Sequence, residues 1–146
     1  MKNKPLTGAA VRVLNGAIMY RYLFIGLGGC CGALSRYFVS VWVARSAGAA
    51  FPFGTLVINL GGSFAIGFLF ELFETLSLPP AYRSFLTIGF LGAFTTFSTF
   101  SLETVNLLRD GEAAYALANA VFSVAGGVLA VYFGTAAARL LMRGAG

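Results

Sequence analysis

The sequence predicts an all-α integral membrane protein with four transmembrane helices. Of its 146 residues, 58% are hydrophobic and only 10% are charged, whereas a soluble domain carries about 25% charged residues. A chain this short cannot bury so much apolar surface in a core surrounded by water. Four apolar runs in the sequence each reach the ~20 residues needed to span a bilayer, and short polar turns separate them.

The four predicted spans follow one another with little sequence between them. They cover approximately residues 22–43, 53–76, 85–108 and 113–142. The connections are too short for an extramembrane domain, so both termini are expected on the same side of the membrane. The lipid bilayer is thus the first partner that the sequence implies, and the predicted location is the cell (plasma or inner) membrane, as a multi-pass protein.

The composition also excludes several classes of function. The net charge is +5, but basic residues of a membrane protein report topology, and there is no soluble basic face for a nucleic acid. The chain has no histidine. Its two cysteines, Cys30 and Cys31, are adjacent in an apolar run, as expected of small packing residues. Without a nucleophile–base pair, a metal cluster or a phosphate loop, an enzyme is not expected.

The first 18 residues differ in character from the rest. They hold two lysines, one arginine and one proline and show little apolar periodicity. We therefore expect a flexible N-terminal extension over residues 1–18 and a transmembrane domain over residues 19–146. Met19 offers a second plausible start of the chain.

Small residues recur four positions apart within the spans. In lipid, such pairs let helix backbones approach closely and mark helix–helix contacts. The pairs are Gly28 and Gly32, Ser63 and Gly67, and Ser123 and Gly127.

The third span contains an unusual segment. Gly89 and Gly92 are followed by five hydroxyl residues within the seven positions 95–101. Glycine, serine and threonine all weaken a helix, and irregular backbone at membrane depth lies only inside protein or beside a water-filled cavity. This pattern predicts a helix break over Gly92–Thr96, near the bilayer centre. The alternative is a continuous helix whose hydroxyls bond the carbonyls four residues earlier.

Aromatic side chains follow the predicted break. Phe94, Phe97 and Phe100 are spaced three apart, on one drifting helical face. Such a stripe commonly serves packing. Alternatively, the electropositive ring edges can contact an anion without a formal charge, and weak contacts of this kind let an ion leave again.

Polar residues form one stripe on the second span and one on the fourth. Each stripe repeats every four residues and so lies on one helical face. One reading is hydrogen bonding between helices; the other is a track of uncharged donors, completed by Ser98, Thr99 and Ser101, for a small anion that sheds its water. The stripes are Thr55, Asn59 and Ser63, and Tyr115, Asn119 and Ser123.

Two ionisable residues lie within the spans. Arg36 is two turns from the end of the first span. It either snorkels as a structural anchor or places an anion-attracting charge in a vestibule. Glu103 comes one turn after Phe100 and is either a solvated residue at a helix end or part of a pore mouth.

Three segments together resemble the Fluc (CrcB) fluoride ion channel family. They are GGCCGALSRY at 28–37, GTLVINLGG at 54–62 and GFLGAFTTFSTFS at 89–101, the third being the most specific. The resemblance covers the chain from Met19 to its end. It implies a channel that exports fluoride passively and so reduces cytoplasmic fluoride toxicity. It also implies an antiparallel, dual-topology homodimer with two pores, each built from both copies.

The resemblance assigns residues as well. Phe97 and Phe100 match the family's phenylalanine box, Asn59 matches its pore asparagine, and Gly92 and Thr95 match a break whose carbonyls, from both copies, hold a structural Na⁺. Further polar pore positions match Thr55, Tyr115, Ser123 and, with a change of side chain, Asn119. With the donors inferred above, the expected fluoride pore is lined by Phe97, Phe100, Asn59, Thr55, Ser98, Thr99, Tyr115, Asn119, Ser123 and Glu103.

A small dual-topology drug or cation exporter is the main alternative. Such a transporter needs a membrane-embedded carboxylate in its first helix to exchange protons for a cationic drug. The first span here carries no acid and contains Arg36 instead.

Overall fold

The fold is a bundle of four long apolar helices. The computed structural model describes residues 8–48, 50–76 and 78–143, and all regular secondary structure within them is helical. The membrane-spanning lengths are Ile18–Ala47, Phe53–Thr75, Pro80–Arg109 and Ala113–Arg143. The prediction of four spans is therefore confirmed, and the third is interrupted. The elements are α1 (Gly8–Ala47), α2 (Phe53–Thr75), α3 (Pro80–Arg83), η1 (Ser84–Leu91), α4 (Gly92–Phe94), α5 (Phe97–Arg109) and α6 (Ala113–Arg143).

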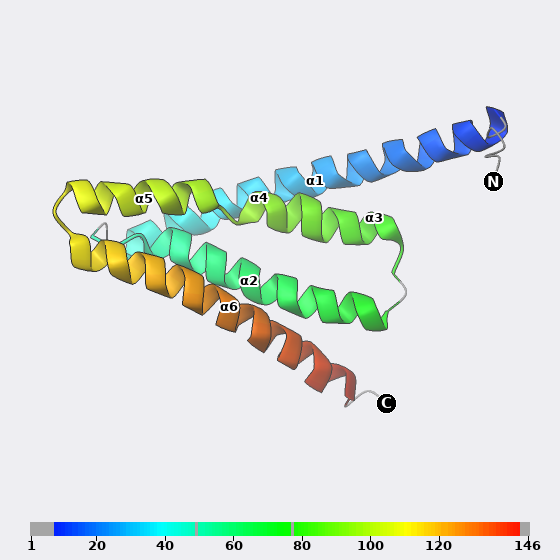
Figure 1. The fold of residues 1–146 in the computed structure, drawn as a ribbon. Helices are drawn as coiled ribbons and strands as arrows, with labels where there is room; N and C mark the ends of the chain where they lie inside the picture. The colour runs from blue at the N-terminus through cyan, green and yellow to red at the C-terminus, as the bar shows by residue number, and fades with distance from the viewer. Residues whose placement is uncertain (1–7, 49, 77, 144–146) are drawn as a thin grey trace, which may run out of the picture.

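The spans run alternately up and down (Figure 1). The start of α1 and the end of α6 lie at the same end of the bundle, as the even number of spans requires. Residues 8–18 of the expected N-terminal extension belong to α1, and residues 1–7 lie outside the described residues.

Glycine and proline define the turns between the spans. Gly48 follows α1 with φ of 76° and Gly111 follows α5 with φ of 81°, a left-handed conformation that only glycine adopts without strain. Pro79 and Pro80 begin the third span, with proline in the first turn of α3, where its missing N–H has no helical partner to lose. These tight turns keep each span beside the next.

The break in the third span is shorter than predicted. Gly92–Phe94 form the helical segment α4, and only Thr95 (φ −80°, ψ 158°) and Thr96 (φ −150°, ψ 121°) are extended. The prediction of a break over Gly92–Thr96 is thus wrong in its first three residues. The preceding segment η1 is a π-helix that contains Gly89, and the helical backbone continues through Gly92.

Two glycines of α1 bring it against the first half of the third span. A Cβ on Gly28 would stand 2.3 Å from the Phe85 carbonyl oxygen, and one on Gly32 would stand 2.1 Å from that of Phe90. Both distances are far below any van der Waals contact, so these positions admit only glycine. The prediction of a contact at this small-residue pair is confirmed.

The α2–α6 contact has the same basis. A Cβ on Gly67 would stand 2.2 Å from the Val131 carbonyl oxygen, and one on Gly134 would stand 2.1 Å from that of Phe64. Further along, a Cβ on Gly127 would reach the Ser63 hydroxyl at 3.5 Å. Thr135 adds a hydrogen bond from its hydroxyl to the Gly67 carbonyl, at 3.2 Å.

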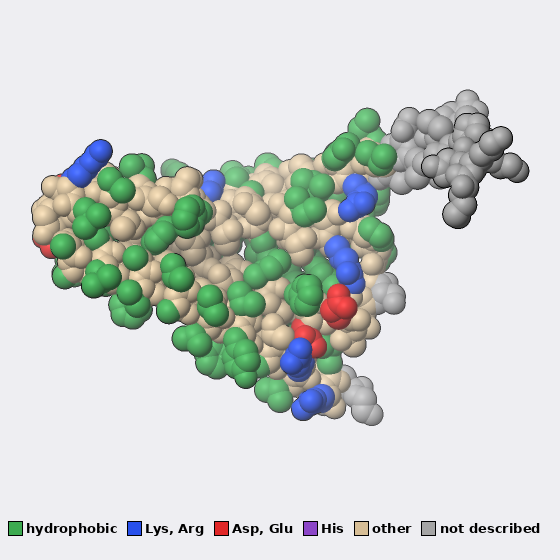
Figure 2. Space-filling view, viewed as in Figure 1, with side chains coloured by type: hydrophobic (Ala, Val, Ile, Leu, Met, Phe, Trp, Pro, Cys, Tyr) green, Lys and Arg blue, Asp and Glu red, His purple; other side chains and the backbone are tan. Residues whose placement is uncertain are grey.

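Apolar side chains cover the outside of the bundle. Leu117 is 67% exposed, Val128 69% and Trp42 61%, which water would not tolerate but lipid does. Figure 2 shows arginine and acidic side chains gathered at the end of the molecule that holds the chain termini. There Arg139 and Glu71 form an ion pair of 2.9 Å between α6 and α2. The charges mark an interface with water, and the apolar surface marks the bilayer.

We predict that Gly32→Ala destabilises the bundle while Gly26→Ala does not. The new methyl group at Gly32 collides with backbone that cannot move aside, whereas nothing lies within 4 Å of a Cβ on Gly26. Overpacking of this kind costs about 1–3 kcal/mol. The measurement is the fraction of monodisperse protein on gel filtration after heating in detergent. Equal thermal stability of the two variants would contradict the close-packing argument.

Candidate functional site

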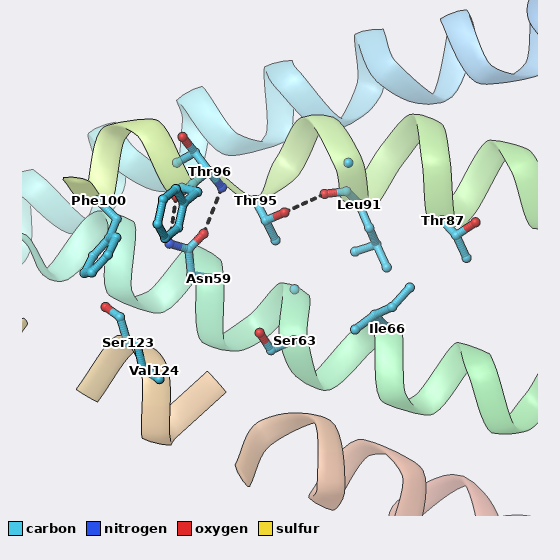
Figure 3. Close-up of a pocket in the computed structure, with 13 residues that line it drawn as sticks. Asn59, Ser63, Ile66, Thr87, Leu91, Thr95, Thr96, Phe100, Ser123 and Val124 are labelled. Carbon is cyan, nitrogen blue, oxygen red and sulfur yellow. Dashed lines mark hydrogen bonds between the residues drawn. The ribbon is translucent and has the colours of Figure 1, made fainter. Parts of the chain in front are cut away.

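The break in the third span is held by one side chain of α2. Asn59 donates from Nδ2 to the Thr96 carbonyl at 3.0 Å, and its Oδ1 accepts from the Thr96 backbone N–H at 2.9 Å. Figure 3 shows both bonds reaching across from α2 to the extended residues. Gly62, one turn further along α2, leaves room for Thr95, since a Cβ there would stand 2.2 Å from the Thr95 methyl carbon.

The break releases backbone carbonyls, those of Gly92 and Thr95 among them. In a continuous helix the Thr96 amide would bond the Gly92 carbonyl and the Thr99 amide would bond that of Thr95. Instead the Thr96 amide donates to Asn59, and the Thr99 amide donates to the Thr96 hydroxyl at 3.3 Å. The Gly92 and Thr95 carbonyls thus lose their helical donors.

Released carbonyls are the chemistry that suits a cation. Unwound backbone at membrane depth coordinates Na⁺ through carbonyl oxygens. Among the described residues, no group of three or more His, Cys, Asp or Glu side chains could hold a metal ion. The released carbonyl oxygens fit the Na⁺ that the family resemblance implies.

Thr96 is the N-cap of α5, the second half of the span, and directly precedes Phe97. Its hydroxyl accepts from the first turn of α5, as expected of a threonine N-cap. Phe97 and Phe100 follow on this turn, with ring centroids 5.6 Å apart and ring planes at 48°. Phe97 is 78% exposed, so it projects away from its own chain, while Phe100 is half-buried.

A central cavity of about 410 Å³ lies beside the break (Figure 3). Its walls come from α2, from both halves of the third span and from α6. Of the residues singled out from the sequence it brings together Asn59, Ser63, Gly92, Thr95, Phe97, Phe100 and Ser123. The remaining lining is Gly62, Ile66, Thr87, Leu91, Thr96 and Val124. The Ser123 hydroxyl is buried and without a hydrogen-bond partner in the described structure.

A second cavity of about 510 Å³ lies near the end of the bundle opposite the termini, between the α1–α2 turn and α5. It holds three more of the predicted residues: Thr55, Thr99 and Glu103. The Thr55 hydroxyl donates to Glu103 Oε1 at 2.8 Å. The other carboxylate oxygen, Oε2, is buried without a partner, so Glu103 faces the protein interior rather than bulk water.

Four predicted residues line neither cavity. Ser98 is exposed, and its hydroxyl lies 3.4 Å from that of Thr96. Tyr115 packs edge-on against Phe51 with ring centroids 6.0 Å apart. Asn119 is completely buried. Arg36 is half-buried on α1.

Sequence reasoning missed three residues with clear roles in this geometry. Thr96 is both the N-cap of α5 and the partner of Asn59, and threonine is a preferred N-cap residue. Gly62 was quoted only as part of a motif, because nothing in one sequence shows which glycine faces Thr95. Thr104, which bonds Asn119, carries no local signal.

Comparisons with known proteins all lead to one family. Residues 23–135 match the family described as CrcB-like protein, Camphor Resistance (CrcB). A protein of Magnetococcus marinus named fluoride-specific ion channel FluC is 50% identical over 119 residues, which are 81% of this chain and 97% of that protein. Proteins of the same name from Chlorobaculum tepidum and Rhizobium meliloti are 48% and 44% identical, over 84% and 85% of this chain and 98% and 100% of theirs.

We predict that Asn59→Ala loosens the break. The substitution removes both bonds to Thr96 and leaves a backbone N–H and carbonyl unpaired, at a cost of about 1–3 kcal/mol for each buried group. Hydrogen exchange in detergent should become faster at the Thr96 amide and in the first turn of α5. Asn106→Ala, at an exposed asparagine of α5, is the control. Unchanged protection around Thr96 in Asn59→Ala would contradict this role.

Proposed function

Since the chain belongs to the CrcB-like family, we propose that it is a fluoride-specific ion channel, not an enzyme, that lets fluoride leave the cell down its gradient. The observation that best supports this proposal is the chemistry of the side chains that line the central cavity. It joins the ring pair Phe97–Phe100 to hydroxyl and amide groups beside a helix break. Among the described residues, neither cavity has a lysine or arginine in its lining.

An uncharged site suits the conduction of a small, strongly hydrated anion. Fluoride must exchange its water for other donors, and the site must still release it. The unpartnered Ser123 hydroxyl can donate to the anion, and the positive edges of Phe97 and Phe100 can contact it without a fixed charge. A buried lysine or arginine would bind the same anion too tightly to let it pass.

The proposed path continues from the central cavity into the second one. Thr99 and Thr55 supply hydroxyl groups there, with Ser98 on the same turn as Phe97. Thr55 binds the Glu103 carboxylate, which keeps one carboxylate oxygen away from an approaching anion. Tyr115 stands beside Phe51, a residue of the cavity wall. Glu103 and Tyr115 accordingly belong to the mouth of the path.

A second copy of the chain, in antiparallel orientation, completes the proposed pore. Phe97 is 78% exposed in one copy, although its place beside the break puts it near the middle of the span. A partner supplies the missing wall. Antiparallel pairing gives two equivalent pores, each with residues from both copies, and brings the two breaks together at the interface.

The two breaks together form the proposed Na⁺ site. The Gly92 and Thr95 carbonyls of each copy have lost their helical donors to Asn59 and Thr96, as described above. Bound there, Na⁺ would neutralise four converging carbonyl dipoles and tie the two copies together. Arg36, half-buried on α1, is proposed as a structural or vestibule charge.

We predict that reconstituted protein releases fluoride from liposomes and excludes chloride, and that Phe97→Ile and Phe100→Ile each abolish most of the fluoride flux. Isoleucine keeps apolar bulk but lacks the positive ring edge. Fluoride and chloride electrodes measure efflux from matched vesicles, and gel filtration checks that the dimer survives. Phe70→Ile, at an exposed position of α2, is the matched control. Equal chloride flux in the wild type would refute the assignment; full activity in both variants would return the rings to a packing role.

We predict that the break binds Na⁺. A high-resolution structure grown in sodium salt should show a cation within reach of the Gly92 and Thr95 carbonyl oxygens of both copies. Protein exchanged into a choline buffer should lose thermal stability and regain it on addition of Na⁺. The proposal of a Na⁺ site would be contradicted if no ion lay at the break and thermal stability did not depend on sodium.

The basic residues are distributed unequally between the two sides of the membrane. An antiparallel homodimer needs both orientations in one membrane, hence nearly balanced basic residues. With four spans, seven basic residues share the side of the termini, against two or three opposite. They are Lys2, Lys4, Arg12, Arg21, Arg83, Arg139 and Arg143, against Arg45, Arg109 and, if it snorkels, Arg36.

A chain started at Met19 loses three of these seven, leaving four against two or three. We predict that this form inserts both ways, while the full chain favours termini on the cytoplasmic side. Single-cysteine labelling from each side of intact cells, after Cys30 and Cys31 are replaced by alanine, measures the ratio. Labelling of the Met19 form from one side only would contradict homodimeric dual topology and require an oppositely oriented partner subunit.

A further inference from the structure

A buried amide lies on α6 between the two cavities. Asn119 is completely buried. One turn later, Ser123 lines the central cavity; one turn earlier, Tyr115 packs against Phe51 in the wall of the second cavity. Residues four apart share one face of a helix. Asn119 therefore stands on the stretch of α6 that connects one cavity to the other.

Only one end of the Asn119 side-chain amide has a hydrogen-bond partner. Its Nδ2 donates to the Thr104 hydroxyl oxygen at 2.9 Å, while its Oδ1 is buried with no partner in the described structure. A buried carbonyl without a donor is costly, and such groups in native structures call for a specific explanation. Ser123 Oγ, one turn away, is in the same condition.

The partner of Asn119 is itself tied to the aromatic pair. The Thr104 hydroxyl donates to the Phe100 backbone carbonyl at 2.8 Å. A hydroxyl has one hydrogen to donate and can accept as well. Because its hydrogen bonds the Phe100 carbonyl, the Thr104 hydroxyl can only accept from Asn119. This orients the Asn119 amide with its NH₂ group toward α5 and leaves its oxygen without a donor.

We propose that Thr104 is a positioning residue that sets, and can reverse, the orientation of the Asn119 amide between the two cavities. The proposal rests on the proposed function. If the Thr104 hydroxyl turns its hydrogen to Asn119 Oδ1, the amide rotates by half a turn and its NH₂ group points to the side now left unpartnered. The two ends of an amide differ little in size, so this reversal needs no repacking.

The reversal costs little elsewhere and supplies what an anion needs. The Phe100 carbonyl keeps the acceptor role that it has in the hydrogen-bond ladder of α5. The buried acceptor Oδ1 gains a donor. An anion that enters the stretch between the cavities meets two amide N–H groups beside the Ser123 hydroxyl instead of a carbonyl oxygen that would repel it. Fluoride itself thus selects the reversed amide.

The experiment begins with fluoride efflux from wild-type liposomes, because absence of that flux would refute the proposed function rather than this inference. Thr104→Val keeps the shape of the side chain and removes the hydroxyl. Loss of one buried hydrogen bond is expected to lower fluoride flux about tenfold. Thr104→Ser restores the hydroxyl and should restore the flux. Thr75→Val, which removes a hydroxyl bonded only to the Glu71 carbonyl in its own helix, is the matched control.

A double-mutant cycle separates positioning from packing. In the Asn119→Ser background, where the shorter side chain cannot reach Thr104, adding Thr104→Val should change the flux less than twofold, whatever the flux of Asn119→Ser itself. An equal loss in both backgrounds would overturn the proposal. The fluoride-to-chloride permeability ratio of Thr104→Val is the independent readout: it should fall, and an unchanged ratio together with unchanged flux would also overturn it. Thr104→Ala replaces Thr104→Val if the latter fails gel filtration.

Discussion

Two hydrogen bonds between the Asn59 side chain and the backbone of Thr96 compensate for a helix that is interrupted inside its span. In a hydrocarbon environment every backbone N–H and carbonyl must find a partner within the protein. The Asn59 side chain presents an N–H donor and a carbonyl acceptor side by side, as a peptide group does, and so takes the place of a neighbouring backbone. Without it, the backbone N–H and carbonyl of Thr96 would lose these two partners, and the break that frees the Gly92 and Thr95 carbonyls would lose its support.

The break also separates two parts of one span that pack against different neighbours. The first part, α3 to α4, lies against α1, where Gly28 and Gly32 allow backbone contact. The second part, α5, lies against α6, and Asn119 and Thr104 connect the two helices. A straight helix would follow one neighbour along its whole length. The two extended residues redirect the chain, and the central cavity lies at the point of redirection.

Much of this architecture follows from the sequence, because the bilayer restricts the choices. Four runs of apolar residues of spanning length leave only helices as a solution. The weakness of the third span was also visible in Gly92 and the hydroxyl residues after it. The exact site of the break was not, because Gly92 remains helical after a π-helical turn, and the extended residues are those that Asn59 can reach. Local propensity identifies where a helix can fail, and tertiary contacts decide where it does.

In the candidate site, too, the sequence predicts local features and the tertiary contacts decide the rest. Residues spaced four apart on α2 and α6 were predicted to share faces, and Asn59 and Ser123 do reach one cavity. The spacing could not show that Thr55 would bind Glu103 near the far end of the bundle, or that Asn119 would be buried against Thr104. These pairs join residues on different helices, and their existence depends on the rotation of each helix about its axis. Close glycine contacts fix that rotation. The sequence can therefore predict which residues share a helical face, whereas the structure is needed to identify their partners on other helices.

Charge is distributed so that the proposed pathway stays neutral. Arg139 is paired with Glu71, and Arg83 bonds the Phe73 carbonyl and lies over its ring, both at the end of the bundle that holds the termini. At low dielectric a single fixed cation would bind fluoride strongly and hold it. Hydroxyl groups, amides and ring edges each offer a weaker contact, and several in sequence replace the water that fluoride sheds without any one of them retaining it. Two carboxylates, Glu103 and Asp110, lie in the lining of the second cavity, and Thr55 occupies one oxygen of Glu103. A channel for a strongly hydrated anion thus depends on many modest donors in line, which a broken helix and two polar faces provide.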